Sequence, residues 1–499
     1  MPSIHGLLVR NGEGTPLGQF VPSGKFGRIF PSLQPLLPPV AALEELGRAM
    51  KDPAPADPKG DNEDVPAGFT YLGQFIDHDI TFDTTPIQEV QVDPLALHNF
   101  RTPALDLDCV YGRGPGDQPY LYELPPNEAR FVLGRTNTTP GIGDPKVKTA
   151  LPFDLPRGSQ NLAIIGDPRN DENLIVAQLH LAFLRFHNKV VDGLKAGTIA
   201  PPPSATQLTL FEQARKLVIW HYQWIVLNDF LRRVVDDDVL DDVLEKGRSF
   251  YLPEGDAFIP VEFSAAAYRL GHSMVREAYD YNEVFTFKDG PRKKVPATLQ
   301  LLFRFSGRSG IGVPIPSDWI IDWRRFFKFP NDGVTAGLSR KLDPFLSPTL
   351  SEIPDHGVLP GTNLPIANLK RGRSLGLPSG QNVARRMRIQ PLSPKDIATG
   401  PDGAVAAKNN LHLETPLWYY ILKEAEQRGG SKRLGPVGSR ILSEVFVGLL
   451  ELDTSSFLAS NPQWTPTLPA AKAGDFTMTD LLSFVGDLAP ISDPKNLNP

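Results

Sequence analysis

A cluster of polar side chains on one predicted helix gives the first sign of chemistry in this sequence. The helix falls in residues 69–85, whose positions are otherwise largely apolar, and the cluster occupies six consecutive positions that include Gln74, Asp77, His78 and Asp79. In a helix Gln74 and His78 share one face, and Asp77 flanks it. Asp79 turns away from that face. Buried polar groups are costly unless they are paired or functional, so the cluster is either a hydrogen-bond network in a core helix or part of a catalytic site. Four such residues at this spacing favour the catalytic interpretation.

A run of oxygen-bearing side chains follows this helix in the segment NFRTPALDLDCVYGRGP. Its even-numbered positions include Thr102, Asp106 and Asp108. An extended chain would point these side chains to the same side. Hard oxygen ligands of this kind suit Ca²⁺, which takes about six to eight of them. The alternative is a polar turn whose Asp side chains are solvated.

Several histidines further along the chain could bind a metal through an imidazole nitrogen. His180 and His187 lie seven residues apart in an apolar helical pattern, and His221 lies in the next predicted helix. These surroundings are more typical of core or surface histidines than of metal ligands. His272 differs, because Ala and Gly residues surround it on a helical pattern. Small neighbours would let a flat macrocycle approach the backbone closely.

The elements that must position these residues are expected to be helices joined by irregular segments. Fifty prolines and 43 glycines among 499 residues favour such connections and little regular sheet. Residues 52–65 are polar and Pro-rich, which predicts a surface linker or exposed loop. A long helix is predicted to begin within the segment GDPRNDEN, with Asp171 and Glu172 in its first turn. Further helices are predicted near residues 41–50, 411–427, 440–452 and 476–485.

Composition limits the class of protein. The chain is 41% hydrophobic and 22% charged, which is ordinary for a globular protein with an ample core. Its formal charge of −6 gives no electrostatic reason to expect nucleic acid or an anionic membrane as a partner. Cys109 is the only cysteine, so an intrachain disulfide is excluded.

No apolar run approaches the ~18 residues of a membrane span, and the N-terminus has no apolar signal core. We therefore expect a protein without a membrane span, either cytoplasmic or secreted by a leaderless route.

The motifs together resemble those of the animal-type haem peroxidases, the peroxidase–cyclooxygenase superfamily. The distal signature Gly-Gln-x-x-Asp-His-Asp of that family is similar to residues 73–79, and its Arg-x-x-Glu segment is similar to residues 169–172. Its proximal Arg-x-Gly-His motif matches residues 269–272, and its Leu-Pro-x-x-Asn-x-x-Arg-x-Arg block matches residues 364–373. The blocks occur in family order, and the resemblance spans roughly residues 60–490. We interpret the chain as a bacterial-type member.

The resemblance implies a role for each residue on the proximal side of a haem. It makes His272 the iron ligand and Asn368 the acceptor for the other imidazole N–H, an interaction that orients the ring. It makes Arg269 and Arg371, together with Arg373, partners of the haem carboxylates, because Arg pairs well with carboxylates.

On the distal side, the resemblance makes His78 the acid–base group and Gln74 the residue that orients peroxide. Arg169 is then the distal arginine that stabilises developing charge, although its nearness to Asp167 and Asp171 also allows a structural ion pair. Asp77 and Glu172 match the two family carboxylates that form ester bonds with haem methyl groups. Asn173 stands where some relatives have a Met that forms a further bond to haem.

The resemblance also implies a calcium site beside the distal helix. Its ligands match Asp79, Thr102, the carbonyl of Ala104, Asp106 and Asp108. Relatives often have Ser at the position of Asp108, so the site here would carry one more negative charge.

The fold expected from this resemblance is mainly α, a helical core around buried haem b with little sheet. We expect an N-terminal arm and linker over residues 1–60 and one catalytic domain over residues 61–499. The expected function is a peroxidase that uses hydrogen peroxide, through a high-valent iron intermediate, to oxidise phenolic or aromatic donors or small anions such as iodide, thiocyanate and bromide.

Two other functions are weighed against this one. A fatty-acid dioxygenase or cyclooxygenase-like enzyme of the superfamily uses a Tyr three residues before the proximal His. Here that position is Arg269, and Tyr268 is four residues before His272. A non-catalytic haem carrier or sensor is the second alternative, but it would need neither Arg169 nor Gln74.

Overall fold

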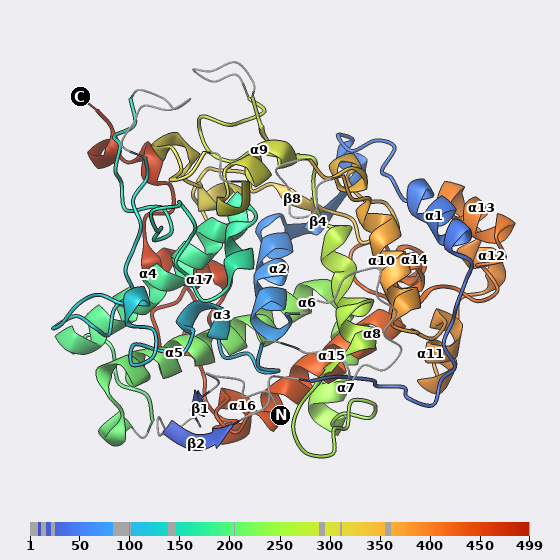
Figure 1. Ribbon diagram of the computed structural model, residues 1–499, viewed down its shortest axis with the longest axis horizontal. Coiled ribbons are helices and arrows are strands. Elements are labelled where there is room, and N and C mark those ends of the chain that lie inside the picture. Colours follow the sequence, from blue (N-terminus) through green and yellow to red (C-terminus); the bar gives the residue numbers. More distant parts are fainter. Residues whose placement is uncertain are drawn as a thin grey trace.

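The computed structural model is mainly α-helical, as predicted, and its strands are short (Figure 1). It describes residues 8–10, 16–20, 25–82, 99, 101–137, 146–203, 205–288, 295–309, 312–354 and 361–498. The N-terminal arm expected over residues 1–60 therefore lies partly outside the described residues. None of the helices described is long and apolar enough to cross a membrane.

The strands of the described chain form four two-stranded pairs rather than one sheet. Only the pair of β3 and β5 is parallel. The pairs are β1 (Leu8–Arg10) with β2 (Pro16–Phe20), β3 (Phe26–Gly27) with β5 (Ile259–Pro260), β4 (Asp61–Pro66) with β8 (Leu338–Arg340), and β6 (Ala278–Tyr279) with β7 (Ala297–Thr298).

Three elements near the centre of the molecule carry the distal cluster, two of the core histidines and the proximal histidine singled out above. Helix α2 (Gly68–Ile80) packs against α4 (Leu174–Ala196) and against η7, the 3₁₀ segment Ala267–His272 (Figure 1). The side chain of Asn173 caps α4 by accepting a hydrogen bond from the backbone N–H of Ile175. Helix α4 ends at Gly197, whose φ of 69° is the left-handed conformation that favours glycine.

The remaining helices surround this centre. α5 (Leu210–Ile225) starts with a capping box and continues through a π-helical turn (Val226–Phe230) into α6 (Leu231–Val234). The others are α1 (Val40–Ala49), α3 (Asp108–Tyr111), α7 (Asp237–Lys246), α8 (Val261–Ser264), α9 (Leu299–Arg304), α10 (Leu364–Ser374), α11 (Gly380–Arg386), α12 (Pro394–Ile397), α13 (Gly400–Lys408), α14 (Leu417–Arg428), α15 (Pro436–Leu452), α16 (Phe457–Ser460) and α17 (Met478–Val485).

The helices predicted near residues 41–50, 440–452 and 476–485 are confirmed as α1, α15 and α17. The helix predicted over residues 411–427 starts later, at Leu417. The preceding residues form a turn in which Thr415 Oγ1 donates a hydrogen bond to the Leu411 carbonyl at 2.8 Å. Pro416, which lacks a backbone N–H, then stands directly before the helix.

Two expectations about local structure were wrong. Residues 61–65 of the stretch predicted as an exposed loop belong to β4 (Asp61–Pro66). This strand pairs with β8 and buries Asn62, whose Nδ2 donates to the Lys432 carbonyl. Asp171 and Glu172 are not in the first turn of α4. They lie at the end of the preceding 3₁₀ segment η4 (Pro168–Asp171) because Asn173 sets the start of the helix.

Candidate active site

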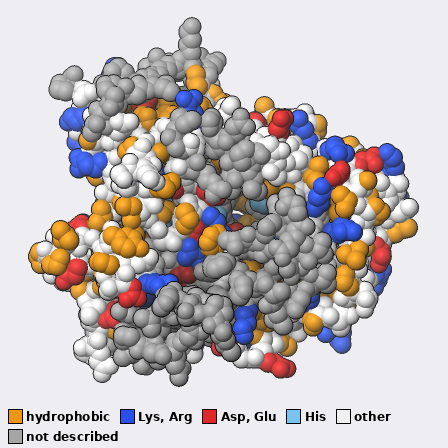
Figure 2. All heavy atoms as spheres, viewed as in Figure 1, with side chains coloured by type: hydrophobic (Ala, Val, Ile, Leu, Met, Phe, Trp, Pro, Cys, Tyr) orange, Lys and Arg blue, Asp and Glu red, His pale blue; other side chains and the backbone are white. Residues whose placement is uncertain are grey.

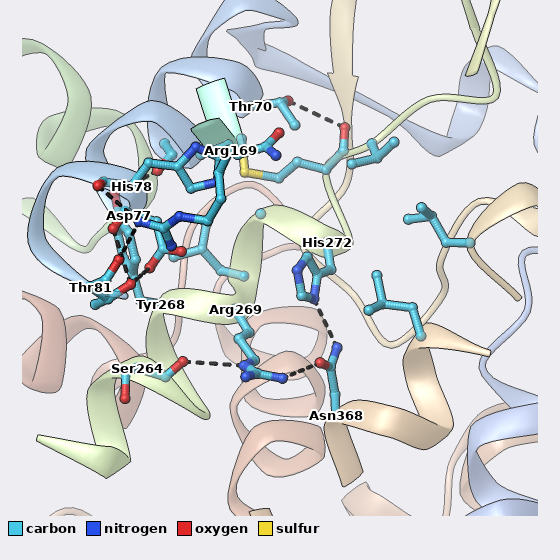
Figure 3. A pocket seen from close by; sticks show the side chains of 18 of the residues that line it. Thr70, Asp77, His78, Thr81, Arg169, Ser264, Tyr268, Arg269, His272 and Asn368 are labelled. Carbon is cyan, nitrogen blue, oxygen red and sulfur yellow. Dashed lines mark hydrogen bonds between the residues drawn. The ribbon is translucent and has the colours of Figure 1, made fainter. Parts of the chain in front are cut away.

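A cavity of about 410 Å³ lies between α2, η4, η7 and α10. This volume is within the range of about 300–1,000 Å³ that is typical of ligand sites. Gln74, Asp77 and His78 line it from α2, and His272 and Asn368 line it from the opposite side (Figure 3). Figure 2 shows a hollow near the middle of one face of the molecule, with Lys or Arg side chains and a histidine at its edge. The sequence had related the residues of α2 to His272 and Asn368 only through their motifs.

His78 is a buried, neutral imidazole. Burial, assisted by the charge of Arg169, lowers the pKa of His78 from 6.5 to about 3. Its Nδ1 lies 2.8 Å from the side-chain oxygen of Asn170. An amide oxygen can only accept, so Nδ1 carries the ring proton and Nε2 keeps its lone pair. The ring therefore has the protonation state that a general base requires.

The guanidinium of Arg169 lines the same cavity and is held firmly from behind. It pairs with the Asp167 carboxylate at 2.7 Å and donates to the backbone carbonyls of His78 and Thr81. It also lies over the ring of Phe82, 4.4 Å from its centroid. Burial alone would raise the pKa of Asp167. The charges of Arg169 and its neighbours outweigh burial and hold that pKa well below its usual range. The structural ion pair considered above is thus present, and it fixes the position of Arg169 at the cavity.

Two carboxylates line the cavity near these groups. Asp77 accepts a hydrogen bond from the hydroxyl of Thr81 at 3.0 Å, and burial raises its pKa although Arg169 opposes the shift. Glu172 is buried and also lines the cavity. Its neighbour Asp171 does not, because it pairs with Arg157 at 2.6 Å. Thr81 was not identified from the sequence, since it follows the helix without belonging to a motif.

His272 ends η7, and its pKa is lowered by burial to about 3, so its ring is also neutral. Its Nδ1 lies 2.8 Å from the side-chain nitrogen of Asn368. The oxygen of that amide accepts a hydrogen bond from Arg269, whose Nε donates to the Ser264 carbonyl at 3.2 Å. The expected hydrogen bond from His272 to the Asn368 oxygen is therefore absent in this orientation, because Arg269 occupies that oxygen.

The arginines of the proximal segment lie in different surroundings. Arg371 is buried. Both Arg371 and Arg269 line the cavity. Arg373 does not line it, because its side chain turns away and donates from Nε to the Pro38 carbonyl at 2.8 Å. The expectation that Arg373 meets a haem carboxylate is thus not supported, while Arg371 remains a candidate for that role.

The residues present fit a haem in this cavity. An added Cβ at Gly271, which lines the cavity beside His272, would meet nothing within 4 Å, so open space adjoins the backbone there. Turning the Asn368 amide over would let its oxygen accept from Nδ1 of His272, at an unchanged distance, and leave Nε2 free to ligate a metal. The same turn would release Arg269 from the amide oxygen and make it available to an anionic group.

The other histidines considered as ligands do not line the cavity. His187 lies between the Tyr111 hydroxyl, 3.0 Å from Nδ1, and the Ala129 carbonyl, 2.7 Å from Nε2. His221 donates from Nδ1 to the Leu217 carbonyl at 2.7 Å, and His180 contacts Asn170. All three are buried, so of the core and surface alternatives given above the core one holds.

Beside α2, three carboxylates converge. One oxygen of each of Asp79, Asp106 and Asp108 lies within 4.8 Å of the others, and the Thr102 hydroxyl lies 3.1 Å from Asp106. Oδ1 of Asp79 is buried and has no hydrogen-bond partner in the described part of the chain. Burial, strengthened by Asp106, raises the pKa of Asp108 to about 7. A divalent cation would offset this repulsion, so the donor set fits calcium.

The route by which these oxygens converge differs from the prediction. The segment is not extended. Its backbone bends through residues 103–106, and Leu107 takes a left-handed φ of 56° before α3 begins at Asp108. The turn gathers the side chains, with the Leu107 N–H donating to Asp79 at 3.2 Å. Ala104 lies in the same turn.

Comparison with known proteins places this geometry in context. The family model of the animal haem peroxidases matches residues 93–446. A peroxidase-like protein of Margaritifera margaritifera is 28% identical over 308 residues, covering 59% of this chain and 36% of that protein. Thyroid peroxidase of Canis lupus familiaris is 27% identical over 312 residues, covering 59% of this chain and 30% of its own length. The chain thus spans about a third of the length of these curated relatives.

Solved structures show the same fold at low sequence identity. Peroxidase A from Dictyostelium discoideum matches with a TM-score of 0.61 at 15% identity, over 96% of both chains. A fatty acid alpha-dioxygenase from Oryza sativa matches with a TM-score of 0.59 at 14% identity, over 89% of this chain and 77% of that chain. The fold alone therefore does not separate a peroxidase from a dioxygenase.

Proposed function

Since the chain belongs to the animal haem peroxidase family, we propose that it binds haem in the cavity between α2 and η7 and uses hydrogen peroxide to oxidise small-molecule donors. The observation that carries this proposal is the pair of neutral imidazoles, the buried His78 and the half-buried His272, that line one cavity from opposite sides (Figure 3). One imidazole is then available to hold iron and the other to move a proton.

Haem supplies redox chemistry to this site when it is bound, with His272 as the ligand of its iron and Arg371 and Arg269 as partners of its carboxylates. His78 takes the proton of peroxide at Nε2 and returns it to the departing oxygen, which is general acid–base catalysis. Arg169, fixed by Asp167 and by two backbone carbonyls, holds a positive charge at the same wall of the cavity and stabilises negative charge that develops there. Gln74 orients the peroxide.

The dioxygenase alternative is less well supported by the site. Arg269 occupies the position at which that mechanism needs a Tyr, and its guanidinium contacts Asn368. Tyr268 lines the cavity, but its hydroxyl donates to the Gly73 carbonyl at 3.0 Å, so it has a structural role there. We therefore propose phenols, aromatic amines and small anions as donors rather than fatty acids.

Two further features belong to this proposal. Asp79, Thr102, Asp106 and Asp108, with the carbonyl of Ala104, would hold a calcium ion directly behind His78. Asp77 and Glu172, which line the cavity, would form ester bonds to the haem. Asn173 offers no thioether for a further bond, and its side chain already caps α4. For this reason we expect iodide, thiocyanate or bromide to be oxidised more readily than chloride.

The test is an optical spectrum of the purified, haem-loaded protein before and after addition of peroxide, followed by a donor screen. A Soret band that changes with peroxide, with oxidation of phenols and iodide but not linoleate, supports the proposal. Oxygen uptake with linoleate would support the dioxygenase instead, and a Soret band without any turnover would support a haem carrier. Rapid chlorination of taurine at neutral pH would contradict the limit placed on chloride.

A further inference from the structure

Behind His78, a chain of buried hydrogen bonds runs away from the cavity. The side-chain oxygen of Asn170 lies 2.8 Å from Nδ1 of His78, and its nitrogen lies 2.9 Å from Nδ1 of His180. The exposed fractions of the three residues are 5% for His78 and 0% for the other two. His78 lies on α2, Asn170 in η4 and His180 on α4, so the chain joins three elements.

The direction of this chain sets the position of the His78 proton. An amide has one end that accepts and one that donates. With its nitrogen on His180, Asn170 presents its oxygen to His78, which keeps the ring proton on Nδ1. If the amide turned over, its nitrogen would donate to Nδ1 of His78 and the proton would move to Nε2. In that tautomer, the nitrogen at the cavity would be an N–H and could not accept a proton from peroxide.

We propose that His180 is a positioning residue for His78. By accepting the hydrogen bond of the Asn170 amide nitrogen, it holds the amide in the orientation that presents the lone pair of His78 Nε2 to the cavity. This inference deepens the proposed peroxidase function and rests on it. It gives a role at the site to a histidine that does not line the cavity and that the motifs do not single out.

A comparison of two histidines on α4 supports a role for His180 beyond packing. His187 uses both ring nitrogens, one with the Tyr111 hydroxyl and one with the Ala129 carbonyl. Within the described part of the chain, His180 makes a hydrogen bond through Nδ1 alone. Its Nε2 is buried and has no hydrogen-bond partner among the described residues, and its ring packs edge-on against Phe75. Leaving a buried polar atom without a hydrogen bond destabilises the fold, so an apolar side chain would suit this place better if only packing mattered.

The test uses the haem-loaded, reduced protein with carbon monoxide as a probe. The C–O stretching frequency falls when an N–H on the distal side donates to the bound ligand, so it reports the tautomer of His78 without any turnover. We expect His180→Phe to add a band at lower frequency and to slow the reaction with peroxide by roughly 10- to 100-fold, within the range of general acid–base effects. His180→Gln, whose side-chain oxygen can accept from Asn170, should restore the original band and most of the rate.

The matched control is His187→Phe, which removes another buried histidine from the same helix. It should lower thermal stability and leave the C–O band in place. If His180→Phe does not fold, Asn170→Leu should give the same low-frequency band, because it removes the acceptor of His78 directly.

An unchanged band and rate in His180→Phe would overturn the proposal, and so would an equal shift in His187→Phe. If the unmutated protein binds haem and carbon monoxide but does not react with peroxide, the proposed function fails. The comparison of bands would still decide the role of His180.

Discussion

The hydroxyl of Tyr268 donates a hydrogen bond to the backbone carbonyl of Gly73 at 3.0 Å. The 3₁₀ segment that ends at His272 is thereby tied to the helix that carries His78. Tyr268 also stacks on Phe263, with ring centroids 4.8 Å apart and an interplanar angle of 9°, so its ring is held in place. The two walls of the cavity are thus joined by a residue that belongs to neither catalytic motif.

Tyr268→Phe should keep the ring packing and lose only this hydrogen bond. We expect unfolding to become easier by about 1 kcal/mol, the typical net contribution of one hydrogen bond, while peroxide-dependent oxidation continues. Thermal melting and a dye-oxidation assay measure the two effects. Tyr71→Phe is the control for stability, because the buried Tyr71 hydroxyl has no hydrogen-bond partner among the described residues. Loss of all turnover in Tyr268→Phe would point instead to chemistry at the tyrosine.

Haem retention should depend on His272 and not on the core histidines. His272→Ala removes the proposed ligand from the cavity wall, so we expect most of the haem to be lost on gel filtration. His187→Ala is the matched control, since that ring is fully hydrogen-bonded outside the cavity and should not affect binding. The ratio of Soret to protein absorbance after purification measures occupancy. Full occupancy in His272→Ala would show that the ligand is another residue.

The sequence was sufficient to predict the mainly α fold, a helix within residues 69–85 that the structure places at Gly68–Ile80, and several of the residues that line the cavity, because each motif has fixed spacing within one element. It could not predict Asn170 or Tyr268, whose roles come from contacts between segments far apart in the chain. The orientation of the Asn368 amide in this structure differs from the predicted one for the same reason. It depends on Arg269, and spacing alone gave no sign that the two side chains meet.

Acid should destabilise the protein through its buried histidines, and His221 gives the clearest case. Its Nδ1 donates to the Leu217 carbonyl, and its Nε2 accepts from the backbone N–H groups of Thr467 and Leu468. Burial lowers its pKa from 6.5 to about 4. Between these two pKa values the unfolded chain binds a proton at His221 that the folded chain does not bind. The free energy of unfolding therefore falls as the pH drops from about 6.5 to 4.

Going from pH 7 to pH 5, this single group should account for about 2 kcal/mol of lost stability. His221→Gln should remove that part of the loss, although it lowers stability at pH 7. Urea unfolding of both proteins at the two pH values measures the difference. The same loss in both proteins would mean that His221 does not resist protonation.

Calcium removal should weaken the fold and the activity together. Asp79 follows His78 directly in α2, so a cation held by Asp79, Asp106 and Asp108 would fix the helix end that carries His78. Without the cation the three carboxylates repel one another. We expect chelation, or Asp106→Ala, to lower the melting temperature and the rate with peroxide. Asp117→Ala, which removes an exposed carboxylate nine residues beyond Asp108, is the control and should do neither. Active protein without calcium by elemental analysis would exclude the site.

Covalent attachment of haem should depend on Asp77 and Glu172, the two carboxylates that line the cavity beside Arg169. If peroxide drives ester formation, haem should resist acid-solvent extraction after peroxide treatment and be extracted more readily before it. The double variant Asp77→Val, Glu172→Gln should release haem under both conditions. Asp171→Asn is the matched control, because the Asp171 carboxylate pairs with Arg157 outside the cavity and cannot reach the haem. Complete extraction from peroxide-treated, unmutated protein would show that no ester forms.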